Sequence, residues 1–115
     1  MINQVTLIGN LGRDPESWQT NDKMLCKLSL ATNENYKDKN DVWQTSTQWH
    51  TVEIWGQAAA LAERMMRKGQ LVYITGSIKY SKYENDAGEI KYKTVIVCQT
   101  FKTLEAKREV EELAY

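Results

Sequence analysis

Hydrophobic and polar residues alternate over several stretches of the chain, as expected for strands that bury one face. The stretch at residues 47–56, "TQWHTVEIWG", raises a question about which groups are buried. Val52 and Ile54 lie on one side, whereas Trp49 and Trp55 share the other side with a threonine and a glutamate. A half-buried strand normally keeps its largest apolar groups inside. The pattern therefore predicts two tryptophans on an outward face, and their position there needs an explanation.

Five strands follow from this alternation and from the breaks between apolar runs. Their predicted ranges are residues 5–11, 24–32, 45–55, 71–83 and 90–101. The segment "RDPES" ends the first strand, because proline removes a ladder donor. Residues 33–41 predict a polar loop, and "ENDAGE" at residues 84–89 predicts a hairpin turn.

The hydrophobic period changes between the third and fourth strands. Residues 56–70 contain alanines and long unbranched side chains that favour a helix, and Gly69 is placed to cap its C-terminal end. Five strands with one helix between the third and fourth is the element order of an all-β OB-fold, a five-stranded Greek-key barrel. The alternative topology is an all-antiparallel sheet with a helical plug.

The length of 115 residues predicts one domain, at residues 1–104, followed by a short acidic tail at residues 105–115. The tail holds four acids and two bases, and sparse apolar residues from Leu104 onward predict a frayed helix there. The net charge of the whole chain is zero, and removing the tail leaves 13 bases and 11 acids. Any anion-binding surface must therefore come from local clustering of bases.

The composition is that of an ordinary globular protein, at 42% hydrophobic and 26% charged residues. No apolar run reaches membrane-spanning length and the start has no signal-peptide pattern, which predicts a cytoplasmic protein without a membrane partner. Cys26 and Cys98 lie in apolar runs and predict buried, reduced thiols. With one histidine and no C-x-x-C pair, we expect neither a metal site nor another cofactor.

Aromatic side chains and lysines are interleaved on the predicted outward faces. The polar side of the fourth strand carries Lys79 and Tyr83, and Lys91 follows the hairpin turn. Flat rings beside ammonium groups suit single-stranded nucleic acid, whose unpaired bases stack on rings while phosphates meet lysines. A protein interface is an open alternative, since interfaces are also rich in Tyr and Trp. Trp18 and Trp43 show no clear face and are assigned to core or loop packing.

Four motifs occur together in one order along the chain. They are "LIGNLGRDPE" at residues 7–16, "LATNENYKD" at 30–38, "TQWHTVEIWG" at 47–56 and "KGQLVYITGSIKYSKYENDAGEIKY" at 68–92. In order and spacing the chain resembles the bacterial-type single-stranded DNA-binding proteins and their mitochondrial relatives, over nearly all of residues 2–101. The resemblance implies an OB-fold that assembles as a homotetramer and wraps single-stranded DNA without strict sequence preference.

The resemblance also assigns residues to roles. The stacking aromatics of the family fall on Tyr36, Trp49, Trp55 and Tyr83. Its phosphate-contacting bases map to Lys37, Lys68, Lys79, Lys82 and Lys91. His50 matches a histidine at a subunit contact, and Tyr73 is assigned to the same interface. These implied roles are non-catalytic, and the chain shows no carboxylate cluster with a base, no nucleophile beside a histidine and no Walker-type loop.

The chain departs from the family pattern in two ways. Thr51, Gln57 and Ser81 stand where many members carry a base, which predicts weaker and less salt-sensitive DNA binding. The usual flexible linker and acidic tip are missing before the end at "EVEELAY", so recruitment of replication and repair proteins through this tail is in doubt. The predicted function is protection of single strands in replication, recombination and repair. The alternatives are an OB-fold protein-interaction module and a dimeric primosome-type paralogue.

Overall fold

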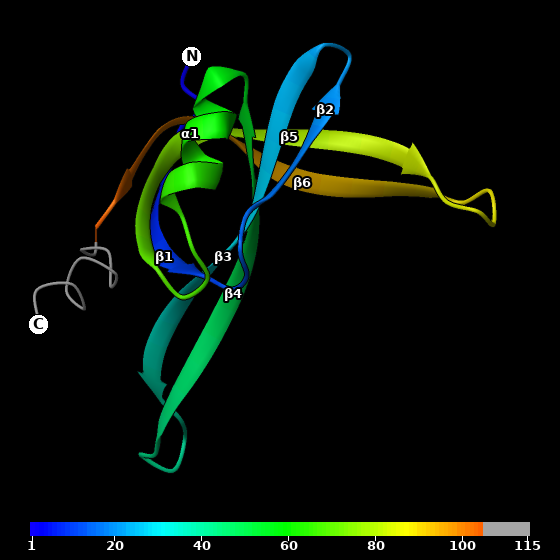
Figure 1. The fold of residues 1–115 in the computed structure, drawn as a ribbon. Coiled ribbons are helices and arrows are strands. Elements are labelled where there is room, and N and C mark those ends of the chain that lie inside the picture. The colour runs from blue at the N-terminus through cyan, green and yellow to red at the C-terminus, as the bar shows by residue number, and fades with distance from the viewer. Residues whose placement is uncertain (105–115) are drawn as a thin grey trace, which may run out of the picture.

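The computed structural model describes residues 1–104 (Figure 1). Its elements in chain order are β1 Val5–Leu11, β2 Glu16–Thr20, β3 Lys23–Lys37, β4 Trp43–Trp55, α1 Gln57–Met65, β5 Leu71–Glu84 and β6 Ile90–Thr103. The expected tail at residues 105–115, with its helix, lies outside the described residues.

Five strands pair in a closed ring. The order β1–β5–β6–β4–β3 is closed by pairing of β1 with β3, and β2 lies beside β3 outside the ring. This ring, with α1 between β4 and β5, confirms the predicted all-β OB-fold. The alternative all-antiparallel sheet is wrong, because β4 and β6 run parallel at the pairs Val52–Ile96 and Glu53–Val97.

Strand β2 was not predicted. It follows the proline-containing segment and forms a hairpin with β3 through Asn21 and Asp22. Both turn residues have positive φ, at 47° and 67°, and such residues are typical of the two-residue turns that join antiparallel strands. The dipeptide Asn-Asp between two short polar runs was the signal in the sequence for this hairpin.

Two other element boundaries differ from the prediction. The polar loop expected at residues 33–41 is mostly strand, since β3 continues to Lys37 and pairs with β4 up to Trp43. The helix is shorter than expected, because it ends at Met65 and Met66 continues in extended conformation. Gly69 therefore does not cap the helix but provides the positive φ of 87° in the turn that leads into β5.

The core fills the interior of the ring. Leu28 and Leu30 of β3 lie on the same inner face as Val52 and Ile54 of β4, and all four are almost completely buried. The helix α1 adds Ala59 and Ala62 to this core, with Met66 after its last turn. Burial of the alternate residues of each strand explains why the opposite residues of β3 and β4 point outward.

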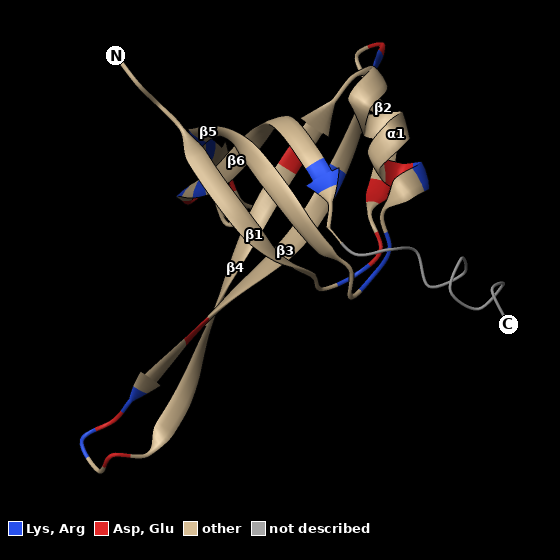
Figure 2. Ribbon diagram, turned by 90° about the vertical axis from the view of Figure 1, so that its left-hand side faces the viewer, with Lys and Arg blue, Asp and Glu red and all other residues tan. Residues whose placement is uncertain are grey.

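Two long arms extend beyond the ring, in addition to the shorter β2–β3 hairpin (Figure 1). The outer halves of β3 and β4 form one arm, and those of β5 and β6 form the other. Figure 2 shows the β3–β4 arm and α1 at opposite ends of the molecule. Both faces of an arm meet solvent, and Tyr80 of β5 is accordingly 71% exposed. No helix within residues 1–104 has the length and apolar character needed to cross a membrane.

Candidate nucleic-acid interface

The outward-pointing residues of β2, β3 and β4 form one continuous surface, which we call the outer face. Its cross-strand rows are Trp18–Leu25–Trp55, Glu16–Lys27–Glu53, Ser29–Thr51, Ala31–Trp49, Asn33–Thr47, Asn35–Thr45 and Lys37–Trp43. Residues opposite one another in a ladder share a face, so four indoles lie on this surface. The prediction that Trp49 and Trp55 point outward is confirmed, since both are exposed.

Trp49 is seated on the backbone of Gly12. Its side chain is 62% exposed, and a Cβ atom on Gly12 would lie 2.3 Å from Cζ3 of the indole. The ring therefore occupies the space that any side chain at position 12 would need. Gly12 is itself held by a hydrogen bond of 2.9 Å from its N–H to the carbonyl oxygen of Ser29. This seat fixes the inner edge of the ring and leaves the rest of the indole open to solvent.

Trp18 and Trp55 lie at the other end of the outer face. They flank Leu25, which is buried although it points away from the core. Trp18 is 41% exposed, so its assignment to core or loop packing was wrong. The Nζ atom of Lys27 lies 5.8 Å from the centre of the Trp18 ring, within the range of a cation–π contact.

Trp43 extends the row of indoles along β4. It is 65% exposed, so its assignment to packing was also wrong. Trp43, Trp49 and Trp55 are spaced by six residues, and this even spacing places all three on the outer face. Lys37 lies opposite Trp43, with its Nζ 5.4 Å from the ring centre. The six-residue spacing could have placed Trp43 on the outer face from the sequence alone. It was missed because the predicted strand began two residues after Trp43.

Tyr36 is exposed near the end of the same arm, but on its opposite face. It pairs with Gln44, whereas its neighbour Lys37 pairs with Trp43. The structure therefore does not bring Tyr36 onto the surface that carries Trp49 and Trp55. The tip of this arm bears charges of both signs (Figure 2).

The turn that joins β3 to β4 is organised by Asp38. Its Oδ1 atom accepts hydrogen bonds from the backbone N–H groups of Asn40, at 2.8 Å, and Val42, at 3.0 Å. Its Oδ2 atom accepts one from Nε2 of Gln44 at 3.0 Å. The bond from Val42, followed by those from Gln44 and Asn40, lowers the pKa of Asp38. The charged carboxylate thus holds the turn in place.

The β5–β6 arm carries the remaining predicted contacts on two faces. Tyr83 is opposite Lys91, and Lys79 lies four residues before Tyr83 on the same face. Lys82 is opposite Tyr92 and lies on the other face. Lys91 also forms an exposed ion pair of 3.3 Å with Glu89. The predicted set is therefore divided between the two faces of this arm.

Lys68 lies near the seat of Trp49. Its backbone N–H donates a hydrogen bond of 2.7 Å to Oδ1 of Asp14, and the next residue, Gly69, donates one of 2.7 Å to the carbonyl oxygen of Leu11. Both bonds attach the turn before β5 to the segment around Gly12. The exposed residue Lys68 thus belongs to a turn that is fixed to the segment on which Trp49 is seated.

The two residues predicted at a subunit interface occupy different surfaces. His50 is half-buried, and its Nε2 atom forms a hydrogen bond of 2.9 Å with the Thr32 hydroxyl. Tyr73 of β5 is opposite Ile8 of β1, whose side chain is largely exposed. Tyr73 and Ile8 therefore form an apolar pair on the outside of the ring, which does not include His50.

Carboxylates also lie on the outer face. Glu53 was expected on the exposed polar side but is only 8% exposed, because it lies between Lys27 on β3 and Val97 on β6. Glu16 accepts an exposed ion pair of 3.1 Å from Arg13. Within residues 1–104, no group of three or more His, Cys, Asp or Glu side chains is placed to hold a metal ion. Both cysteines are free thiols, with Cys26 buried and Cys98 half-buried.

Comparisons with known proteins match nearly the whole described chain. Residues 2–104 match the model of the Single-strand binding protein family. The chain is 38% identical over 108 residues to single-stranded DNA-binding protein 1 of Chlorobaculum tepidum and 40% identical over 104 residues to the single-stranded DNA-binding protein of Xylella fastidiosa. These matches cover 92% and 90% of this chain but only 67% and 63% of the relatives' own lengths.

Solved structures agree with the sequence matches. A Plasmodium falciparum SSB in complex with ssDNA superposes with a TM-score of 0.83 at 28% identity, covering 91% of this chain and 97% of the other. A deletion mutant of the single-stranded DNA binding protein from Thermus aquaticus superposes with a TM-score of 0.78 at 26% identity. That match covers 92% of this chain and 52% of the other.

Proposed function

This chain belongs to the single-strand binding protein family, and we propose that it coats single-stranded DNA without catalysis and with little sequence preference. It protects unpaired strands during replication, recombination and repair, in the cytoplasm at the nucleoid. The observation that carries the proposal is the row of exposed indoles on the outer face, interleaved with lysines.

The physical reason is that unpaired bases expose their flat faces and duplex bases do not. Each base that stacks on an aromatic side chain contributes about 1–3 kcal/mol, and every base can do so. Trp49 and Trp55 offer such rings on the outer face, and the flanking Trp43 extends the row. A surface of this kind favours single strands over duplex and tolerates any sequence.

The lysines supply the second part of the mechanism. A strand is first attracted along Lys37, Lys68, Lys79, Lys82 and Lys91 and is then held by stacking. Tyr36 and Tyr83 lie on the two arms, with Tyr36 behind the face that bears Trp49. A DNA strand that stacks on both Tyr36 and Trp49 must therefore bend around the edge of the β3–β4 arm. Such a path suits DNA that wraps around the protein rather than DNA that runs straight across it.

We further propose that the protein assembles as a homotetramer. The apolar pair formed by Ile8 and Tyr73 supports a contact between subunits through β1 and β5, with His50 at a second position. Light scattering of the free protein tests this, since a dimer would favour the primosome-type paralogue. Sedimentation of an Ile8→Asp variant as smaller species is the result expected from the proposal.

The binding proposal is tested by titrating a labelled oligo-dT with the wild type and with Trp49→Ala and Trp55→Ala variants. Fluorescence anisotropy is expected to show affinities weakened roughly 5- to 150-fold by each variant, the equivalent of one lost stack. Leu61→Ala is the matched control, because Leu61 is an exposed apolar residue of α1 on the β6 side. No binding by the wild type would favour a protein-interaction module instead, whereas unchanged affinity in both tryptophan variants would show that these rings do not stack on the bases.

A further inference from the structure

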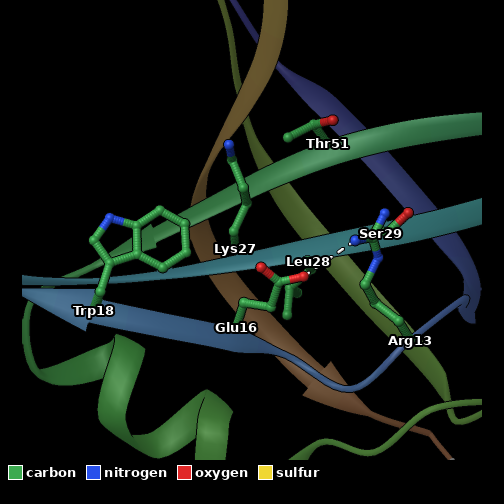
Figure 3. Close-up of a pocket in the computed structure, with 7 residues that line it drawn as sticks. All are labelled: Arg13, Glu16, Trp18, Lys27, Leu28, Ser29 and Thr51. Atoms are coloured by element: carbon green, nitrogen blue, oxygen red, sulfur yellow. Dashed lines mark hydrogen bonds and ion pairs between the residues drawn. The ribbon is translucent and has the colours of Figure 1, made fainter.

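A hollow of about 280 Å³ lies on the outer face between the row of Trp18 and Trp55 and the row of Trp49 (Figure 3). Its lining residues are Arg13, Glu16, Trp18, Lys27, Leu28, Ser29 and Thr51. Figure 3 shows the Trp18 ring at one end and the Arg13–Glu16 pair at the other, with Lys27 between them. No motif of the sequence pointed to this hollow.

The hollow exists because small side chains separate larger ones. Ser29 and Thr51 form the row between the Lys27 row and the Trp49 row, and neither fills the space above the sheet. The rows of Trp55 and Trp49 are six residues apart, which is about 20 Å at roughly 3.3 Å per residue. Thr51 lies between these two rings on β4 and lines the hollow, so a single strand that stacks on both rings runs along the edge of the hollow.

The walls of the hollow match the parts of a nucleotide. Trp18 offers a partly exposed π-face, and the Nζ atom of Lys27 lies 5.8 Å from its centre. Arg13 contributes a second cation, and its ion pair with Glu16 is more than half exposed on both sides. Exposed pairs of this kind contribute little to stability, so Arg13 can exchange its carboxylate partner for a phosphate.

We propose that this hollow is an additional nucleotide subsite, in which one base stacks on Trp18 while Lys27 and Arg13 bind the adjoining phosphates. The inference rests on the proposed function and defines the path of the strand between Trp49 and Trp55. It adds to the binding surface one ring and two cations that neither the motifs nor the resemblance assigned.

The competing explanation is that Trp18 only covers Leu25. Three variants separate the two roles: Trp18→Leu retains apolar cover over Leu25 but removes the flat ring, Trp18→Phe retains a ring, and Lys27→Gln removes a cation. Affinity for an oligo-dT and its salt dependence are measured for each variant, together with the melting temperature.

The subsite predicts that Trp18→Leu weakens binding roughly 5- to 150-fold with little change in melting temperature, and that Trp18→Phe restores most of the loss. Lys27→Gln is expected to lower the slope of log K against log salt by about 0.7, the value for one phosphate on a single strand. Wild-type affinity in Trp18→Leu, with weakened binding in Trp49→Ala, would overturn the subsite and leave the proposed function standing. Wild-type affinity in both variants would overturn the subsite and the stacking on Trp49, whereas no binding by the wild type would refute the proposed function.

A second measurement uses Trp18 as the only tryptophan, with the other three replaced by phenylalanine. Stacking of a base on Trp18 predicts that its emission is quenched on addition of oligo-dT. Emission that stays constant while anisotropy shows the DNA bound would overturn the subsite. A purely structural role of Trp18 predicts this constant emission and a lowered melting temperature in the Trp18→Leu variant.

Discussion

Replacing Gly12 by alanine is expected to weaken DNA binding because it displaces the indole of Trp49 without changing that residue. The added Cβ would lie 2.3 Å from Cζ3 and 2.7 Å from Cη2 of Trp49, whereas ordinary contacts are 3.4–4 Å. Gly12 has no left-handed φ, so alanine suits its backbone. The indole must therefore leave its seat on position 12.

The size of the effect follows from how the ring is held. Because Trp49 is 62% exposed, its ring can tilt toward solvent without disturbing the core. We expect the stability of Gly12→Ala to change by about 0.5 kcal/mol or less, as is usual for surface substitutions. A displaced ring forfeits part or all of a stack worth about 1–3 kcal/mol, so affinity falls by up to roughly 150-fold, with Trp49→Ala as the upper limit.

Gly9→Ala is the matched control. A Cβ on Gly9 would lie 2.2 Å from the carbonyl oxygen of Ala31, which belongs to the backbone of β3 and cannot tilt away. This control is expected to lower the unfolding midpoint in urea, whereas Gly12→Ala lowers the oligo-dT affinity measured by anisotropy. If Gly12→Ala binds as tightly as the wild type while Trp49→Ala binds weakly, the reasoning about the seat is refuted.

Four further predictions follow from the structure. Trp43→Ala is expected to weaken binding of long oligo-dT but not of oligomers too short to reach the end of the β3–β4 arm, as affinity measured against length will show. Burial raises the pKa of Cys98 to about 11 and also raises that of Cys26, so native protein should react with a thiol reagent at pH 8 far more slowly than unfolded protein. Because the pKa of Asp38 is lowered, the stability contributed by its charged carboxylate is fully present above the ordinary carboxyl pKa and is lost as pH falls through the lowered value. The Val42 amide resonance, which reports on the hydrogen bond to Asp38, should therefore shift only in that acidic range. Salt titration should give a slope of log K against log salt about 0.7 flatter for each of Thr51, Gln57 and Ser81, where the family resemblance places a base, and a slope as steep as that of a fully basic family member would contradict this.

The alternation in β4 was sufficient to predict the outward tryptophans. Val52 and Ile54 are buried in the core, so the strict period of two fixed Trp49 and Trp55 on the opposite side. The element order likewise predicted the barrel, because five apolar runs and one helical period match five paired strands and α1. Both successes come from segments with one face against the core.

The signal fails where neither face of a strand reaches the core. The outer part of β3 and β4 carries polar residues on both sides, so no alternation of hydrophobic and polar residues reaches Tyr36 or Trp43. Neither residue could therefore be assigned to a face from the sequence. Trp18 was missed because β2 is a short strand outside the ring that follows a proline. The burial of Glu53 depends on Lys27 and Val97, which are distant in sequence and are brought beside it only by the sheet.

Tryptophan emission during titration with oligo-dT is the most direct test of stacking on the outer face. Single-stranded oligo-dT should quench the emission to saturation as anisotropy rises, whereas a duplex of the same length should cause little quenching. Bound single strand with unchanged emission would contradict stacking on these indoles.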